Sequence, residues 1–197
     1  MSIKPIQTNY AGCRFRSRLE ARWAVFFDTL KWSWTYEPQG FELPEGNYLP
    51  DFWVEQLGAY LEIKPSDAVI KSRDWFCVHQ LPNATGKPAW MVVGQPWPLA
   101  HEIYTSSILA NPDPTIYGEI FNTFADCRRC NGVTLLSDRS DTEIGLVAEL
   151  PVGVHTCEPH DKFAINPLDL EGGRTYTAYR AARSARFEYG EQGACGG

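Results

Sequence analysis

The sequence contains no long apolar run. The amino terminus, Met-Ser-Ile-Lys-Pro-Ile, has no stretch of signal-peptide length, and nothing in the chain approaches the roughly 20 consecutive apolar residues of a membrane span. We therefore expect an intracellular, cytoplasmic protein with no membrane partner. In that compartment the six cysteines are more often reduced, buried or metal-bound than paired in disulfides.

The sequence is also short of positive charge. It has 18 lysines and arginines against 24 acidic residues, a formal net charge of -6. This balance argues against a protein that coats nucleic acid through bulk charge, although it leaves room for local basic patches. Carboxylates that bind metal ions would add to the negative total.

Internal repeats and low-complexity tracts are missing too, apart from a Gly-rich tail over residues 193–197. The chain has 197 residues, of which 44% are hydrophobic and 13% aromatic. It is therefore long enough for one domain of generous size, or for a core with a small appendage.

Two short apolar runs surround a Gln-Leu-Gly turn within residues 48–65, which predicts two adjacent antiparallel strands. The side-chain period of two places Glu62 and Lys64 on the same face of the second strand. Asp51, at a bend after Pro50, can lie opposite them. Charges on a strand commonly form a solvent-exposed face. These strands are apolar enough to be covered on both sides, where charges are costly unless paired or metal-bound.

The sequence Pro50-Asp51, ten residues and then Glu62-Ile63-Lys64 resembles the PD-(D/E)xK signature of the restriction-endonuclease-like nuclease superfamily. The resemblance implies a metal-dependent deoxyribonuclease in which Asp51, Glu62 and the Ile63 carbonyl hold one or two Mg (or Mn) ions. It also implies that Lys64 orients or deprotonates the attacking water, or stabilises developing charge. Because the carboxylates oppose deprotonation of Lys64, we favour orientation and charge stabilisation.

A helix is predicted from about Arg16 to Leu30, because apolar residues recur there at helical spacing. Ser17 is a plausible cap, and Glu20 three residues later is its capping-box partner. The alternative for Glu20 is a catalytic or metal-binding role, since its position on the helix directs it into the protein. In the superfamily that Asp51 and Glu62 suggest, the first helix carries such an acid toward the metal.

The predicted element order is helix, three strands, helix and strand, in an α/β fold. This order resembles the αβββαβ core of the superfamily, with a mixed sheet, and we assign it to residues 1–97. Pro96-Trp97-Pro98 suggests a boundary. The order rests on a first strand in 34–43, the strand pair, a helix starting at Ser66-Asp67 and ending at Pro82, and a strand at 89–94. Residues 98–126 are expected to form a connecting segment after this core, with a short helix from Ala100 to Leu109.

A second group of residues has zinc-ligand spacing. Cys127 and Cys130 form one pair with a two-residue gap, and Cys157 and His160 form another. Thiolates and imidazole suit zinc, and four protein ligands predict a closed, structural site. His155 could replace His160, and buried or free cysteines are the alternative reading. The module would cover residues 127–163, with a small hairpin formed by Val133–Leu136 and Ile144–Ala148.

Two rows of arginines are candidates for nucleic-acid binding. One row steps by four along the first helix, and the other steps by three along a helix predicted from Thr175 to Tyr189, capped by Gly190 within residues 164–197. The alternative is a charged, solvent-exposed surface, with cations near a helix carboxyl terminus favoured by the helix dipole. The two rows are Arg14, Arg18 and Arg22, and Arg180, Arg183 and Arg186.

These observations lead to the expectation of a Mg-dependent endonuclease or exonuclease that acts on DNA and carries structural zinc. The alternatives are a DNA-binding or scaffold protein with a non-catalytic nuclease fold, and an enzyme that acts on RNA. A further alternative is a nuclease subunit of a recombination, transposition or defence assembly, with protein partners or as a homodimer. The sequence does not distinguish sequence-specific, structure-specific and exonucleolytic cleavage.

Overall fold

The structure is a computed structural model that describes residues 5–66, 72–98, 100–106, 120–121, 123–126, 132–136 and 172–187. Its helices are α1 (Arg18–Thr29), α2 (Arg73–Thr85) and α3 (Arg174–Ser184). Its strands are β1 (Thr8–Tyr10), β2 (Cys13–Phe15), β3 (Trp34–Tyr36), β4 (Phe41–Leu43), β5 (Gly46–Tyr48), β6 (Phe52–Val54), β7 (Ala59–Lys64), β8 (Ala89–Gly94), β9 (His101–Ser106), β10 (Ile120–Phe121), β11 (Thr123–Asp126) and β12 (Val133–Leu136).

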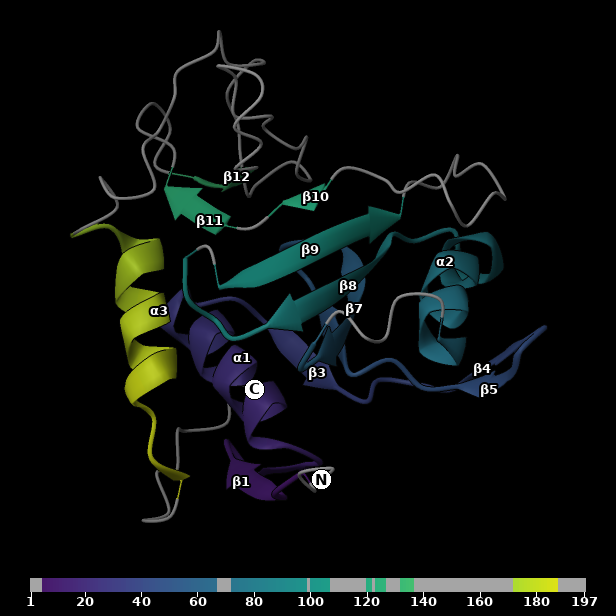
Figure 1. Ribbon diagram of the computed structural model, residues 1–197, viewed down its shortest axis with the longest axis horizontal. Helices are drawn as coiled ribbons and strands as arrows, with labels where there is room; N and C mark the ends of the chain where they lie inside the picture. The colour runs from purple at the N-terminus through teal and green to yellow at the C-terminus, as the bar shows by residue number, and fades with distance from the viewer. Residues whose placement is uncertain are drawn as a thin grey trace, which may run out of the picture.

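A mixed six-stranded sheet forms the centre of the described chain, in the order β10-β9-β8-β7-β6-β3 (Figure 1). Strands β7 and β8 are parallel, and every other neighbouring pair of this sheet is antiparallel. The parallel pair requires a crossover, which α2 provides. The predictions of an α/β fold, of a mixed sheet and of the antiparallel pair around the Gln-Leu-Gly turn are therefore confirmed.

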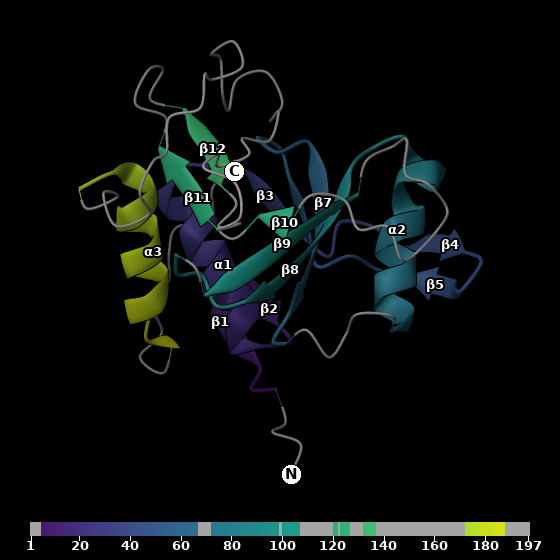
Figure 2. The same ribbon diagram turned by 45° about the horizontal axis from the view of Figure 1, so that its top comes forward.

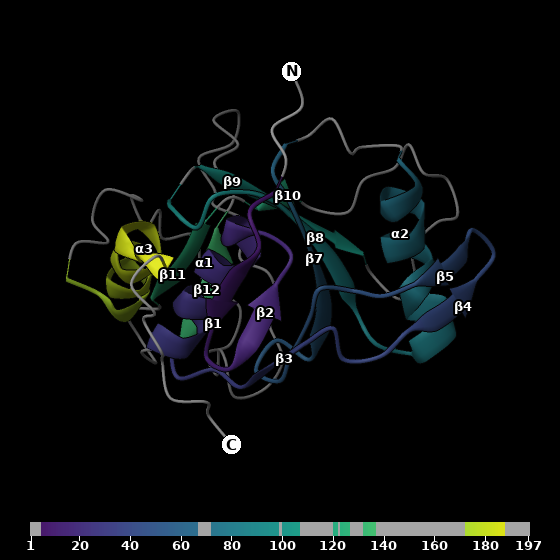
Figure 3. The ribbon, with the colours of Figure 1, turned by 90° about the horizontal axis from the view of Figure 1, so that it is seen from below.

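Helices cover both faces of this sheet. Figure 3 shows α1 and α3 on one side and α2 on the other. The side-chain period of two separates two apolar cores accordingly: Trp90 and Val92 of β8 face the core built on α1, and Met91 and Val93 face the core built on α2. Glu62 alternates with the α1-facing residues of β7, so it points to the α2 side.

Helix α1 begins at Arg18, two residues after the predicted Arg16, and the predicted cap Ser17 is confirmed. The Ser17 hydroxyl oxygen accepts the Glu20 backbone N–H at 3.2 Å. The buried side of α1 is aromatic, and Phe26 packs against Tyr179 of α3 with ring centroids 4.6 Å apart. Tyr179 also accepts the backbone N–H of Phe124 in β11 at 2.7 Å. Helix α3 thus belongs to the same core as α1, and Figure 2 shows β11 beside it.

The expected helix from Ala100 to Leu109 is wrong, because His101–Ser106 is strand β9 and pairs along β8. A short run of mixed apolar and polar residues fits either period, and the free edge of β8 decides in favour of the strand. Residues 98–126 therefore supply two strands of the central sheet, β9 and β10, instead of only a connection.

Three further differences concern element boundaries. The strand expected over 34–43 is split between β3 in the central sheet and β4 in a separate hairpin with β5. Helix α2 begins after the cap Ser72, and it continues through Pro82 to a left-handed Gly86 at φ 67°. Strand β12 pairs with β11, where the sequence analysis had paired it with Ile144–Ala148, and the latter lies outside the described residues.

Candidate active site

Asp51 and Glu62 come to the same part of the sheet from neighbouring strands. β6 and β7 pair with Phe52 opposite Leu61, so the next position outward brings Asp51 beside Glu62. The Ile63 backbone N–H donates to Asp51 Oδ2 at 2.8 Å and fixes that carboxylate against β7. Both acids are buried, with 3% of Asp51 and 4% of Glu62 exposed. The exposed-face alternative for these acids is therefore wrong.

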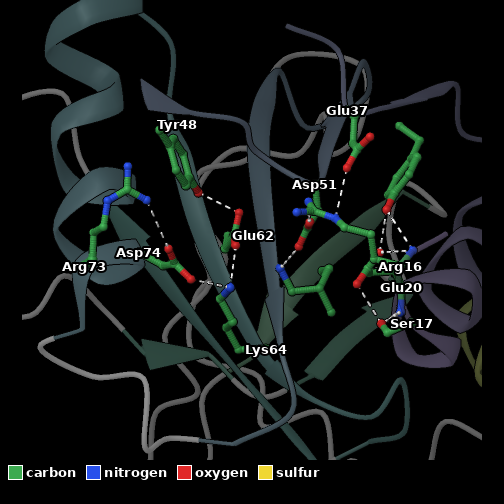
Figure 4. A network of polar contacts seen from close by, with 12 residues as sticks. Arg16, Ser17, Glu20, Glu37, Tyr48, Asp51, Glu62, Lys64, Arg73 and Asp74 are labelled. Atoms are coloured by element: carbon green, nitrogen blue, oxygen red, sulfur yellow. Dashed lines mark hydrogen bonds and ion pairs between the residues drawn. The ribbon is translucent and has the colours of Figure 1, made fainter. Parts of the chain in front are cut away.

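Glu62 belongs to a group of four side chains that we call the Glu62 cluster: Tyr48, Glu62, Lys64 and Asp74 (Figure 4). The Tyr48 hydroxyl donates to Glu62 Oε2 at 2.6 Å. Lys64 Nζ lies 2.7 Å from Glu62 Oε1 and 2.6 Å from Asp74 Oδ2. Asp74 comes from the first turn of α2, so the helix that covers this face adds a second acid to the lysine.

Asp51 belongs to a second group, the Asp51 cluster: Arg16, Glu20, Tyr36, Glu37 and Asp51. Arg16 Nη2 lies 2.8 Å from Asp51 Oδ1, and Arg16 Nε lies 2.9 Å from Glu37 Oε1. Glu20 Oε2 accepts the Tyr36 hydroxyl at 2.7 Å and the Arg16 backbone N–H at 3.1 Å. The Ile63 N–H bond to Asp51 links this cluster to strand β7, which carries Glu62.

Glu20 contacts the helix cap and also lies in the Asp51 cluster, while its catalytic or metal-binding role stays a prediction. Its Oε1 accepts the hydroxyl of the helix cap Ser17 at 2.7 Å, as a cap partner does. Its Oε2 faces Tyr36 in the Asp51 cluster, and only 7% of the residue is exposed. The carboxylate of Glu20 is close enough to Asp51 to raise the pKa of that acid.

The two central acids are costly in their ionised form. Burial raises the pKa of Asp51 well above its ordinary value, and repulsion from Glu62 and Glu20 raises it further, against the opposing effects of Ile63 N–H and Arg16. Burial likewise raises the pKa of Glu62, although Lys64 opposes this shift. The site therefore concentrates negative charge that its own cations neutralise only in part.

Lys64 is a cation in this arrangement. Burial by itself would lower the pKa of Lys64, but the charges of Glu62 and Asp74 raise it overall. Opposition to deprotonation from two carboxylates is what the sequence predicts. Asp74, which comes from a different element, is a carboxylate that this prediction does not include.

The four oxygens of Asp51 and Glu62 each face a different donor: Arg16, Ile63 N–H, Lys64 and Tyr48. Within the part of the chain that the structure describes, no three His, Cys, Asp or Glu side chains gather closely enough to hold a metal ion by themselves. A metal site here would therefore combine two carboxylates with other oxygen donors.

Sequence reasoning missed three polar partners of the motif: Arg16, Tyr48 and Asp74. Arg16 carried a weak signal, because it precedes the helix cap and lies four residues before Glu20. Tyr48 and Asp74 carried none, since a tyrosine on a hairpin strand and an acid in the first turn of a helix are both ordinary.

The first arginine row does not form one helical stripe. Arg14 lies on strand β2, outside α1, and its guanidinium contacts the Gln7 side chain. Its placement on the helix was wrong, because the chain is extended until Ser17 caps α1. Arg18 and Arg22 do lie on α1, and Arg22 Nη1 donates to Gln95 at 2.7 Å.

The second arginine row is exposed, and it extends past its helix. Helix α3 ends at Ser184, earlier than the predicted Tyr189, so Arg186 lies beyond it. Arg180 and Arg183 lie on α3, and the guanidinium carbon of Arg183 is 4.6 Å from the ring centroid of Trp97. The expected cap at residue 190 lies outside the described residues.

The expected zinc ligands also lie outside the described residues, and so does most of the proposed module at 127–163. They are Cys127, Cys130, Cys157 and His160, with His155 as the alternative.

Comparison with protein-family models, with curated proteins and with solved structures found no match to this chain. Among the described residues there is no helix of the length and apolar character that crossing a membrane requires. The function must therefore be argued from the geometry and charge of the site.

Proposed function

We propose that this protein is a metal-dependent deoxyribonuclease of the PD-(D/E)xK type, with the αβββαβ core of that superfamily. The observation that carries the proposal is the convergence of Asp51 and Glu62, both buried, with Lys64 bonded to Glu62 on the next position of the same strand face. The described element order α1, β3, β6, β7, α2, β8 supports it, with the β4–β5 hairpin as an insertion.

The donor set suits magnesium or manganese. Mg²⁺ prefers oxygen ligands, keeps several waters and is commonly bound through only one or two carboxylates. Asp51, Glu62 and the Ile63 carbonyl offer such ligands, and Glu20 lies at the edge of the site. The raised pKa of Asp51 supports the assignment, because a buried acid that other acids repel gains most from an added cation.

The proposed roles of the residues follow from these contacts. Asp51, Glu62 and the Ile63 carbonyl would hold the ion, which when bound supplies positive charge beside the phosphate and acidifies a water. Lys64 stays protonated between Glu62 and Asp74, so it neutralises charge that develops on the phosphate oxygens. Tyr48 keeps Glu62 oriented through its 2.6 Å hydrogen bond.

DNA is the proposed substrate, because a phosphodiester requires neutralisation along its backbone as well as at the scissile bond. The exposed arginines of α3, Arg180 and Arg183, and the α1 arginines Arg18 and Arg22 are the proposed backbone contacts. A non-catalytic DNA-binding protein and a subunit that is active only in a larger assembly remain the alternatives, and the following experiment separates them.

The purified protein should cleave plasmid or linear DNA with Mg²⁺ or Mn²⁺ and lose activity in EDTA. Glu62→Gln should reduce the rate by at least about 100-fold, because it removes a charged metal ligand worth several kcal/mol in the transition state. Glu55→Gln removes the same charge from an exposed position just after β6 and is the matched control. DNA binding without cleavage under any metal would favour the non-catalytic alternative. Activity that appears only with a partner protein would favour the assembly.

Structural zinc is a second part of the proposal. In the sequence the first cysteine pair falls between β11 and β12, two strands that pair with each other, and its two-residue gap is the spacing of a zinc knuckle. Elemental analysis of protein purified without metal-affinity resin should find about one zinc per chain, and Cys127→Ser should lose it. If the purified protein contains no stoichiometric zinc, the zinc proposal is wrong and the cysteines are reduced or buried residues without a metal.

A further inference from the structure

Arg16 has a backbone held by two hydrogen bonds and a side chain that is about half exposed. Its backbone N–H bonds Glu20 Oε2 at 3.1 Å and the Tyr36 hydroxyl oxygen at 3.1 Å, directly before the helix cap. Its side chain is 54% exposed, although it contacts Asp51, whose side chain is only 5% exposed. The guanidinium therefore reaches from solvent into the acidic site.

Glu37 is placed to hold the other edge of this guanidinium. It follows β3 with φ +47°, a left-handed conformation that costs free energy for a residue with a side chain. Its backbone N–H bonds the Asp51 carbonyl oxygen at 2.8 Å, and its carboxylate lies 2.9 Å from Arg16 Nε. Among its partners, which include Tyr36, Arg16 thus has one that the metal would need, Asp51, and another that it would not, Glu37.

On this geometry, and resting on the proposed function, we propose that Arg16 is the phosphate-binding residue of the site. Arg16 Nη2 occupies Asp51 Oδ1, an oxygen that the proposed ion would need. With a divalent ion held by Asp51, the Arg16 guanidinium would leave Asp51 Oδ1, stay attached to Glu37 and present its remaining N–H groups to a phosphate oxygen of the substrate. A planar guanidinium fork suits this role better than an ammonium.

The proposal predicts opposite changes in two affinities. Because Arg16 competes with the metal for Asp51, Arg16→Gln should bind Mn²⁺ about fivefold more tightly, as expected for loss of a partly exposed ion pair. Because one phosphate contact is lost, the same change should weaken DNA binding about tenfold and lower its salt slope by about 0.9. Arg16→Lys should lie between Arg16→Gln and wild type in DNA affinity.

Mn²⁺ affinity is measured from the concentration dependence of thermal stabilisation, and DNA affinity in a Lys64→Met background that keeps the carboxylates but lacks the catalytic ammonium. Lys87→Gln is the control, because this exposed lysine lies before β8, at the strand end opposite the Lys64 position. It should change neither affinity by more than about twofold, as usual for an isolated surface charge.

The outcomes separate this proposal from the proposed function. If wild type shows no saturable Mn²⁺ stabilisation, the metal site fails and Arg16 has no role there. Suppose that wild type binds Mn²⁺, but that Arg16→Gln binds Mn²⁺ no more tightly or binds DNA with undiminished affinity. The proposal for Arg16 is then overturned, and the proposed function is not. A lower melting temperature with both affinities unchanged would leave Arg16 as a structural ion-pair partner only.

Discussion

Asp51→Asn should abolish DNA cleavage while making the metal-free protein more stable at pH 8. The activity loss should be at least about 1,000-fold, because the change removes the buried charge proposed to hold the ion. The asparagine oxygen can still accept the Ile63 N–H, so the strand pair keeps the bond that Asp51 Oδ2 makes at 2.8 Å. The measurements are a cleavage assay and thermal unfolding of the two proteins in EDTA.

The sign of the stability change follows from the direction of the pKa shift. Burial, Glu62 and Glu20 raise the pKa of Asp51 in the folded protein above its ordinary value of 3.8. Between those two pKa values the folded state binds more protons than the unfolded state, so wild type loses stability as the pH rises through this window. The asparagine cannot ionise, and its advantage should therefore be largest at pH 8 and disappear near pH 4.

Added Mn²⁺ should reverse the order of the two proteins. Wild type should gain stability by mass action, because the ion binds the folded state, and Asp51→Asn should gain little. Asp28→Asn is the control, since Asp28 accepts Trp34 Nε1 at 2.9 Å on the far end of α1, and it should keep both activity and the Mn²⁺ effect. Undiminished cleavage by Asp51→Asn would remove the site assignment. A variant less stable than wild type at pH 8 would mean that the Arg16 ion pair outweighs burial.

The central strands and their acids were predictable because a local rule governs them. A side-chain period of two and a short turn place Glu62 and Lys64 on one face, and the β6–β7 register brings Asp51 to them. The cap at Ser17 is equally local, since the hydroxyl and the N–H that it accepts are three residues apart. Structure of this kind is predictable because it depends on residues that are close together in the sequence.

The rest of the site depends on contacts between distant segments. Asp74 reaches Lys64 only because α2 folds back over the sheet, and Tyr48 reaches Glu62 across 14 residues. The helix predicted in place of strand β9 is wrong for the same reason. The residues of β9 fit a helical and a strand period equally well, and pairing with the edge of β8 decides for the strand. Arg14 was misplaced because helical spacing was extended past the cap, where the chain is already a strand.

His101 should make the protein sensitive to acid. It begins β9, is 3% exposed and lies with its ring centroid 5.0 Å from that of Trp23. Its Nδ1 is 2.9 Å from the Trp97 carbonyl oxygen, which can only accept, so Nδ1 carries the proton and Nε2 is the free acceptor. The Tyr179 hydroxyl, 3.5 Å from Nε2, accepts the Phe124 N–H and has its own hydrogen available for the imidazole. These contacts are all satisfied by a neutral ring.

Burial lowers the pKa of His101 from 6.5 to about 4, against the opposing backbone hydrogen bonds of Trp97 and Gln95. Between these two values the unfolded chain binds a proton that the folded protein does not. The contribution of His101 to the free energy of unfolding is therefore complete above pH 6.5 and decreases as the pH falls. Below about pH 4 this residue causes no further loss. The full loss corresponds to about 3 kcal/mol, or roughly a 300-fold change in the unfolding equilibrium.

Denaturant unfolding between pH 7 and pH 4 measures this loss. In His101→Gln the free energy of unfolding should fall much less over this pH range than in wild type, even if the variant is less stable at pH 7. His79→Gln is the control, because burial also lowers the pKa of His79 but that residue is only partly buried. It should remove a smaller part of the slope. Should His101→Gln fail to fold, the ring proton resonances of His101 in wild type should still show no titration between pH 8 and pH 5. A His101 ring that titrates near pH 6.5 would contradict the burial and the hydrogen bonds on which this prediction rests.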